Sequence, residues 1–333
     1  MMDGTPQLLK IRDLRINFDT VHGLVKAVDG VDLDVFQGEC LGVVGESGSG
    51  KSVTFKSVAG LIRKPGRIAS GRIEFNGIEL TQASERQLRK LRGKEIALTL
   101  QDALTALNPS IKVGEQIREV LKIHDRSLFQ KGKKAVQDYI VEMMRMVGIP
   151  DSESRLDDYP HQFSGGMRQR IMIAIALSCK PKLLIADEPT TALDVTIQAQ
   201  VLSLIADLRK KLDMAVVIIT HDLGVVAEYT DRVAVMYAGQ IVETGNTKDI
   251  IRSPEHPYTR GLLRSIPDLS NLDQAIHPIP GQIPDVSNLP QYCRFYPRCE
   301  QATDQCRQIV ELRSLSPQRK SRCLFSSLSP EKS

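Results

Sequence analysis

The stretch "CLGVVGESGSGKS" (residues 40–52) joins a short apolar run, a glycine-rich loop and the start of a helical pattern. An apolar run that ends at glycine is typical of a buried strand. The loop fits G-x-x-x-x-G-K-[S/T], and its position between a strand and a helix makes it a strong prediction of a phosphate-binding loop, or P-loop. Its backbone N–H groups are expected to surround phosphate oxygens, helped by the helix N-terminus. The residues expected to hold nucleotide and Mg²⁺ are Gly45, Ser47, Gly48, Gly50, Lys51 and Ser52.

A second apolar run, "LLIADEP" (183–189), ends in two adjacent carboxylates. Asp187 at the tip of the expected strand suits the ligand shell of Mg²⁺. Glu188 follows it and suits a role in polarising an attacking water. Two adjacent carboxylates are often only solvated, but a buried strand and a P-loop in the same chain favour the catalytic interpretation.

The stretch "HQFSGGMRQRIMIAIAL" (161–177) predicts another helix that begins with glycines. Ser164 is a good N-cap, and Gly165 and Gly166 allow close approach of a ligand to the backbone. The sequence therefore predicts two separate phosphate-binding helix starts.

The remaining pattern indicates an α/β protein. Residues 8–18 and 25–38 alternate as strands do, residues 114–179 have helical spacing, and residues 182–187 and 214–220 are apolar runs on either side of a helix. A parallel sheet with crossover helices accommodates such buried strands. After residue 252 prolines are frequent and periodicity is weak, so a boundary is expected near residue 250.

Composition limits the alternatives. The 333 residues favour two or three folding units, and the net charge of +4 does not require a nucleic-acid partner. The N-terminal residues do not form a secretory leader pattern, and no apolar run approaches the roughly 18 residues of a membrane span. A cytosolic protein, or one attached to a membrane through partners, is therefore expected. Residues 290–325 carry seven basic and three acidic side chains, and the simplest interpretation is a solvated basic face.

In the order of its motifs, the chain resembles the ABC-transporter ATPases over roughly residues 8–250. "SGGM" at 164–167 is similar to that family's signature, although Met167 stands where glutamine is usual. The resemblance gives Gln101 the role of the Q-loop glutamine, which senses Mg²⁺ and transmits to the membrane partner. It also makes 191–194 ("TALD"), with Asp194, the D-loop, His221 the switch histidine and Phe18 the aromatic that stacks on adenine.

The resemblance implies a RecA-like P-loop core with an N-terminal antiparallel β subdomain, a helical signature subdomain and an irregular cysteine-containing C-terminal extension. The expected bounds are 1–105 with 181–250 for the core, 106–180 for the signature subdomain and 251–333 for the extension. It also implies that ATP lies between the Lys51 loop of one subunit and the Ser164–Gly166 helix start of another. Glu188 then orients water, and His221 contacts the γ-phosphate.

"LLIADEPTTALDVTIQAQ" (183–200), "HPYTRGLLRSIP" (256–267) and the cysteine-containing tail resemble the D-type ATPases of dipeptide and oligopeptide importers. This implies an F-type ATPase partner or a second copy, two membrane permeases and, indirectly, an extracytoplasmic peptide-binding protein. The place implied is the cytoplasmic face of the bacterial inner membrane, as a peripheral subunit. Where this branch reads glutamine, acid, proline, the chain has Ala103 in place of proline, which affects the expected coupling loop.

Alternatives remain open. Relatives in the same importer branch handle glutathione, nickel chelates or antimicrobial peptides, and this chain does not touch the substrate. A soluble ABC ATPase of translation or DNA repair usually has two cassettes or a coiled-coil insertion, and this chain has neither. A nucleotide sensor without hydrolysis is disfavoured because Glu188 and His221 are intact.

Four cysteines, Cys293, Cys299, Cys306 and Cys323, follow C-x5-C-x6-C-x16-C spacing. In a reducing compartment, clustered cysteines favour a metal over disulfides. Structural zinc usually shows closer pairs, whereas the tail resembles ones that hold a [4Fe–4S] cluster. The surrounding basic residues would offset the negative charge of such a cluster. An iron–sulfur cluster, zinc, and free thiols or disulfides all remain candidates.

Overall fold

The computed structural model of the chain describes residues 5–21, 23–99, 101, 103–191, 193–265 and 278–326. The chain divides into two compact units, Met1–Gln82 with Ile219–Ser333 (the first unit) and Ala83–Ile218 (the second unit). The division falls inside strand β8 (Ala215–Thr220), between Ile218 and Ile219. The three-part division expected from the sequence stays a prediction.

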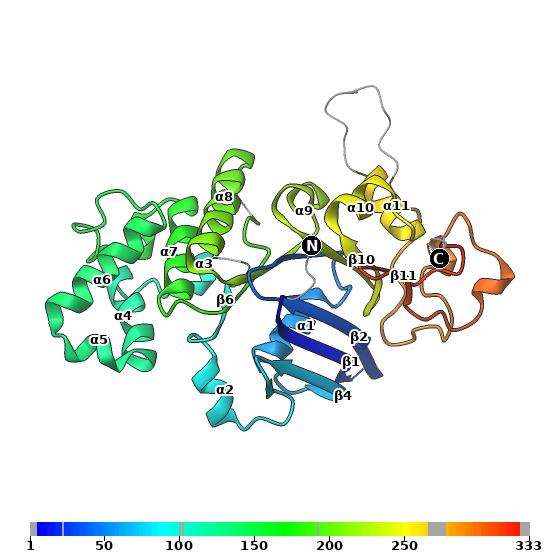
Figure 1. The fold of residues 1–333 in the computed structure, drawn as a ribbon, viewed down its shortest axis with the longest axis horizontal. Helices are drawn as coiled ribbons and strands as arrows, with labels where there is room; N and C mark the ends of the chain where they lie inside the picture. Colours follow the sequence, from blue (N-terminus) through cyan, green and yellow to red (C-terminus); the bar gives the residue numbers. More distant parts are fainter. Residues whose placement is uncertain are drawn as a thin grey trace. The chain divides into compact units, whose positions relative to one another are not determined.

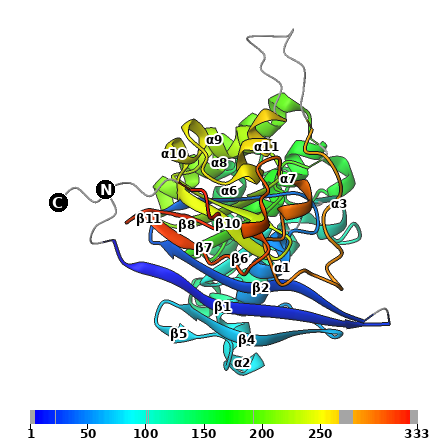
Figure 2. The ribbon, with the colours of Figure 1, turned by 90° about the vertical axis from the view of Figure 1, so that its right-hand side faces the viewer.

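The first unit contains an antiparallel sheet with strand order β2-β1-β4-β5, drawn in blue shades in Figures 1 and 2. Its strands are β1 (Gln7–Thr20), β2 (Gly23–Phe36), β4 (Gly66–Phe75) and β5 (Ile78–Glu79). Leu9, Ile11, Leu14 and Ile16 of β1 are fully buried. The step of three between Ile11 and Leu14 coincides with a register shift in the ladder, so one face stays apolar across the irregularity. The expected antiparallel β subdomain is confirmed.

The same unit contains a second group of strands in the order β11-β12-β10-β9-β3. These are β3 (Cys40–Val44), β9 (Arg232–Tyr237), β10 (Gln240–Asn246), β11 (Arg313–Ser316) and β12 (Arg319–Ser321). β3 and β9 are parallel, whereas β12 pairs antiparallel with β10. The C-terminal region, here residues 251–265 and 278–326, is therefore joined to the P-loop unit by main-chain hydrogen bonds, which the weak periodicity of its sequence did not predict.

The first unit also contains four α-helices among its described residues. They are α1 (Lys51–Val58), α9 (Leu223–Tyr229), α10 (Thr247–Arg252) and α11 (Pro257–Arg264), with short 3₁₀ turns at Tyr296–Arg298 and Asp304–Cys306. All five residues of β3 are buried, as expected of the strand that leads into a P-loop. The predicted succession of strand, loop and helix at residues 40–58 is confirmed.

The second unit combines strands in the order β8-β7-β6 with a group of helices. Its strands besides β8 are β6 (Ile96–Thr99) and β7 (Leu183–Asp187), which run parallel. Its helices are α2 (Glu85–Leu91), α3 (Ala103–Ala106), α4 (Val113–His124), α5 (Arg126–Gln130), α6 (Lys133–Met146), the 3₁₀ turn Pro160–Gln162, α7 (Gly165–Leu177) and α8 (Val195–Leu212). Val136, Ile140 and Met143 lie buried on one face of α6, as their spacing predicted.

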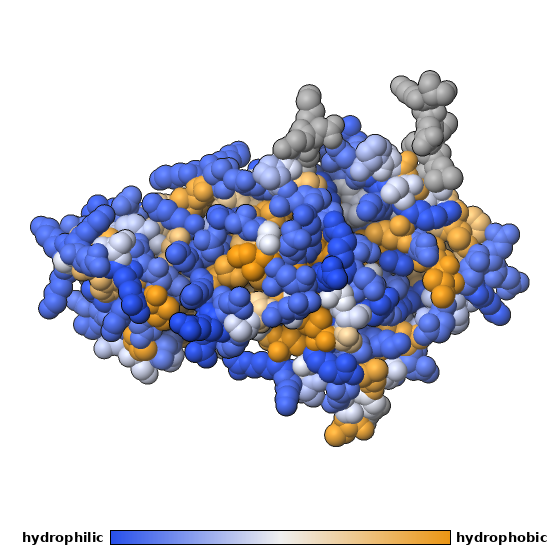
Figure 3. Space-filling model, turned by 60° about the horizontal axis from the view of Figure 1, so that its bottom comes forward, coloured by the Kyte–Doolittle hydropathy of each residue, from blue (hydrophilic) through white to orange (hydrophobic). Residues whose placement is uncertain are grey.

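None of the helices in the described part of the chain is long and apolar enough to cross a bilayer. On the face drawn in Figure 3, hydrophilic side chains predominate, and hydrophobic ones gather in separate patches rather than in a continuous band.

Candidate functional site: a nucleotide-binding cassette and a cysteine-lined pocket

The P-loop is the segment Gly45–Gly50 between β3 and α1. Gly50 has φ 98°, and a Cβ at this position would lie 2.4 Å from the carbonyl oxygen of Ala27. A Cβ on Gly45 would lie 2.1 Å from the carbonyl oxygen of Met236. The loop is therefore packed so closely against neighbouring backbone that only glycine fits at its two ends.

The side chain of Lys51 lies inside this loop. The residue is only 5% exposed, and its Nζ donates to the carbonyl oxygens of Gly45 (2.6 Å) and Glu46 (3.0 Å). A phosphate group that binds the ammonium has to replace these bonds. Ser52 follows Lys51 in the first turn of α1 and is half-buried.

Phe18, the predicted adenine contact, is half-buried on β1 opposite Gly66 of β4. A Cβ on Gly66 would lie 2.5 Å from the Phe18 ring. Gly66 therefore makes room for this ring, a role that sequence reasoning missed because nothing near Gly66 resembles a nucleotide motif.

The second unit brings together two of the predicted catalytic residues. The Gln101 side-chain amide donates through Nε2 to Glu188 Oε2 at 2.8 Å, and the Thr191 hydroxyl donates to the same oxygen at 2.9 Å. Glu188 follows the buried Asp187 at the end of β7 and has φ 47°, a left-handed conformation rare for a residue with a side chain. Such strain is typical of functional positions, because it persists only where the surroundings hold it. Sequence reasoning did not predict the part of Thr191 in orienting Glu188.

The signature helix α7 begins as predicted. The Ser164 hydroxyl accepts the N–H of Met167 at 3.4 Å, and both Ser164 and Gly165 are exposed. A Cβ on Gly166 would lie 2.6 Å from Ile197 of α8. Close packing against α8 is therefore one physical reason for glycine here, beside the approach of a ligand.

The last two predicted residues lie in different units. Asp194 caps α8 by accepting the N–H of Ile197 at 2.9 Å in the second unit, and His221 is exposed in the first unit, directly after β8. Ala192 of the predicted D-loop and Asp102 beside Gln101 lie outside the described residues.

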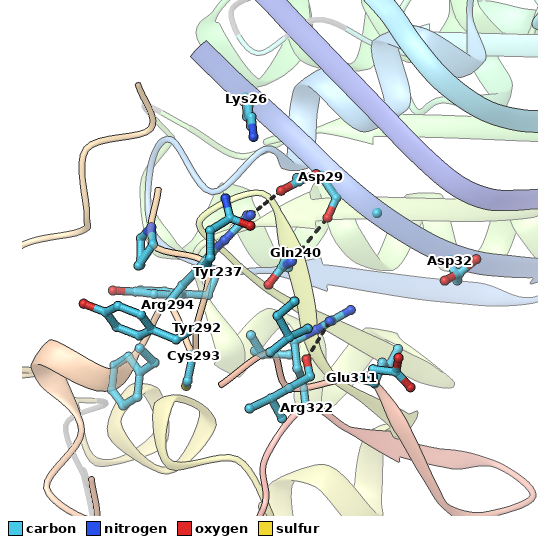
Figure 4. A pocket seen from close by; sticks show the side chains of 18 of the residues that line it. Lys26, Asp29, Asp32, Tyr237, Gln240, Tyr292, Cys293, Arg294, Glu311 and Arg322 are labelled. Carbon is cyan, nitrogen blue, oxygen red and sulfur yellow. Dashed lines mark hydrogen bonds and ion pairs between the residues drawn. The ribbon is translucent and has the colours of Figure 1, made fainter. Parts of the chain in front are cut away.

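The arginines of the C-terminal region correct one expectation. Arg294 and Arg298 are 8% and 6% exposed, so the interpretation of a solvated basic face is wrong for them. Arg294 forms an ion pair with Asp29 of β2, and both residues line the pocket of ≈ 570 Å³ drawn in Figure 4. Arg298 pairs with Glu46 of the P-loop. These buried arginines balance carboxylates far away in the sequence, which local charge counting does not reveal.

The four tail cysteines line one small pocket together with Phe295, Tyr296 and Val310. Burial and the neighbouring thiols raise the pKa of Cys293 to about 11, and burial also raises the pKa of Cys299. Among the described residues, however, no group of three or more His, Cys, Asp or Glu side chains is arranged to hold a metal ion. The four thiols thus surround a cavity without converging on one point.

His256 closes the same region and is 2% exposed. Its Nδ1 accepts the N–H of Tyr258 at the start of α11, and burial together with Arg322 and Arg260 lowers its pKa to about 3. These contacts give His256 a structural role as the N-cap of α11.

A P-loop and a capped glycine-led helix start, together with the strained Glu188, define an ATP-binding cassette. The family model "ABC transporter" matches residues 28–191. A dimeric ATP-binding cassette solved in a post-hydrolysis state with ADP and Pi has the same fold, with a TM-score of 0.65 and 24% identity over 72% of this chain and 99% of that one. These matches, together with the relatives of 48% and 53% identity described next, show that the chain belongs to the ABC-transporter ATPase family.

A second family model, "Oligopeptide/dipeptide transporter, C-terminal region", matches residues 242–306. The dipeptide transport ATP-binding protein DppD of Escherichia coli is 48% identical over 96% of this chain and 96% of its own length. The oligopeptide transport ATP-binding protein OppD of Bacillus subtilis is 53% identical over 86% of this chain and 79% of its own. These similarities assign the chain to the dipeptide and oligopeptide branch of the family.

Proposed function

We propose that this chain is the ATP-hydrolysing subunit of an importer of dipeptides or oligopeptides. The observation that carries the proposal is the coexistence of a complete nucleotide motif set with a C-terminal region that matches the peptide-transporter model. We further propose that it works at the cytoplasmic face of the bacterial inner membrane. There it would pair with an F-type ATPase or a second copy beneath two permeases, which receive substrate from an extracytoplasmic peptide-binding protein.

The proposed mechanism divides the work between residues. Backbone N–H groups of the P-loop and the Lys51 ammonium bind the phosphates, because Lys51 exchanges two carbonyl acceptors for charged oxygens. Phe18 stacks on the adenine. Glu188, whose carboxylate is oriented by Gln101 and Thr191, accepts a hydrogen bond from the attacking water and aims it at the γ-phosphate.

The donor set proposed for Mg²⁺ consists of the Ser52 hydroxyl, the Asp187 carboxylate and the Gln101 amide oxygen. These hard oxygen ligands are the kind that Mg²⁺ takes together with substrate phosphates. The amide of Gln101 suits this role, because its nitrogen donates to Glu188 and its oxygen is a hard ligand of the kind that Mg²⁺ takes. Bound Mg²⁺ supplies charge neutralisation at the phosphoryl oxygens.

The signature start supports the proposed head-to-tail dimer. Ser164 and Gly165 present the N-terminus of α7 at the surface of the second unit, where the γ-phosphate of a nucleotide on another subunit can meet it. Asp194 and His221 would complete the closed interface, with His221 at the γ-phosphate.

The transport proposal is tested with the chain purified together with its permeases. In membrane vesicles, uptake of a labelled dipeptide and peptide-stimulated ATP turnover are expected, with glutathione and a nickel chelate as the competing substrates. If only glutathione or only the nickel chelate stimulated turnover, the assignment as an ABC ATPase would stand, but the transported substrate would not be a peptide. If the chain hydrolysed ATP but did not copurify with any permease, the result would favour a soluble ABC ATPase instead.

We also propose that Cys293, Cys299, Cys306 and Cys323 hold a [4Fe–4S] cluster. Four thiols around one pocket supply the ligand number that such a cluster takes. Because the described side chains are not arranged to hold a metal ion, the four thiols would have to converge when the cluster binds. Purification without oxygen, an absorption spectrum and metal analysis test this. A brown, iron-containing protein is expected. If the analysis found zinc and no iron, the four cysteines would form a zinc site, and a metal-free protein would refute both assignments.

A further inference from the structure

Glu46, the second residue of the P-loop, is held by two side chains of the C-terminal region. Its backbone N–H donates to the Tyr258 hydroxyl at 2.9 Å. Its carboxylate accepts two parallel bonds from Arg298, from Nη1 to Oε2 at 2.7 Å and from Nη2 to Oε1 at 3.0 Å. The pairing is bidentate, the geometry in which arginine fixes a carboxylate in both position and orientation.

Arg298 is itself rigidly placed. Its side chain is 3% exposed, and its Nε donates to the carbonyl oxygen of Pro280 at 2.8 Å. The guanidinium lies 5.7 Å from the ring centroid of Tyr237 and 6.0 Å from that of Phe295. The hydrogen bond to Glu46 raises the pKa of Arg298, so the guanidinium stays cationic.

The same segment of the loop holds the lysine. The Lys51 ammonium bonds to the carbonyl oxygens of Gly45 and Glu46, so the position of Glu46 determines one of its two main-chain acceptors. When the ammonium leaves these carbonyls for a phosphate, Glu46 still accepts the two bonds from Arg298 and still donates its N–H to the Tyr258 hydroxyl. The loop can therefore keep its shape while its lysine changes partners, which lowers the ordering cost of nucleotide binding.

We propose that Arg298 is a positioning residue for the nucleotide, acting through Glu46 on the P-loop. The inference rests on the proposed function only in that the P-loop binds ATP. Loss of the Arg298–Glu46 pair should raise the KM for ATP and the nucleotide Kd about tenfold while kcat changes less than about twofold, because preorganisation affects binding of substrate and transition state alike.

The experiment uses the chain in complex with its membrane partners and measures nucleotide Kd, KM and kcat. Arg298→Met and Glu46→Gln should each raise Kd and KM, and the double variant should be no worse than the worse single one, because both remove the same contact. Arg298→Lys, which keeps the charge without the two parallel bonds, should fall between Arg298→Met and the unchanged protein.

Arg319→Met is the matched control. Arg319 also belongs to the C-terminal region and forms a well-buried pair with Glu243 of β10 at 3.0 Å, but this pair does not involve the P-loop. Its KM and Kd should stay unchanged. An unchanged KM in Arg298→Met, or an equal rise in Arg319→Met, would overturn the proposal. If Arg298→Met fails to fold, Glu46→Gln still decides, since it leaves the arginine in place. Failure of the ATP-binding assignment itself would be visible separately, as undiminished ATP affinity in Lys51→Ala.

Discussion

The two predicted phosphate-binding helix starts, at α1 and at α7, are built in opposite ways. The start of α1 is buried, has no side-chain cap and is held by residues from elsewhere in its own unit. The start of α7 is exposed and carries its own serine cap. A site fixed by its own chain can bind a ligand alone, whereas an exposed start is suited to a ligand that another subunit brings. The difference predicts that nucleotide binding depends mainly on the first unit, whereas turnover also requires Glu188 and the start of α7 in the second unit.

The largest expected effect comes from Glu188→Gln. The amide cannot accept a proton from water as the carboxylate does, so turnover should fall by about 10²–10⁴-fold. The nucleotide Kd should stay within about threefold, since the phosphates are assigned to the P-loop. Single-turnover assays and equilibrium nucleotide binding measure the two quantities. Unchanged hydrolysis would remove Glu188 as the residue that orients water.

Lys51→Ala tests the role of the first unit in nucleotide binding. Loss of the ammonium should weaken ATP binding by about 10²-fold, since a charge-assisted contact to phosphate is lost in a buried loop. Turnover at saturating ATP should fall as well, because Lys51 is expected to contact the γ-phosphate too. If binding instead stayed intact and only turnover fell, the division between a binding unit and a hydrolysing unit would be wrong.

The sequence predicted the continuous motifs well and the long-range contacts poorly. The strand, loop and helix at residues 40–58 and the capped start of α7 each depend on neighbouring residues, so a short window contains their determinants. The pairs of Arg298 with Glu46 and of Arg294 with Asp29 join residues more than 250 positions apart. Nothing local distinguishes these arginines from solvated ones. The pairing of β12 with β10 and the packing of Tyr258, Leu289 and Phe295 against the core bring the C-terminal region into place.

A smaller effect is expected when pH changes the stability of the C-terminal region, which contacts the P-loop. His256 is buried and neutral, because burial lowers its pKa from an ordinary value of 6.5 to about 3. Between these two pKa values His256 is protonated in the unfolded chain but not in the folded chain. The free energy of unfolding therefore falls as pH drops below 6.5. The loss should reach about 2 kcal/mol at pH 5 relative to neutral pH.

Chemical denaturation at pH 7.5 and pH 5 measures this loss. His256→Asn keeps a side-chain acceptor for the N–H of Tyr258 but does not titrate, so its stability should depend less on pH by about 2 kcal/mol. Equal pH dependence in both proteins would assign the effect to other groups.

The smallest effect separates capping from phosphate binding at α7. Ser164→Ala removes the bond to the N–H of Met167 and should cost about 1 kcal/mol of stability. Ser84→Ala removes an equivalent cap at α2, where Ser84 and Gln87 form a capping box, and should cost a similar amount or less. Thermal unfolding should therefore shift by only a few degrees in either variant, about the size expected for such a change. Turnover in the assembled complex should fall only in Ser164→Ala, because only α7 is expected to meet the γ-phosphate. If turnover fell equally in both variants, Ser164 would act only as a helix cap, and the proposed contact of the α7 start with the γ-phosphate would be wrong.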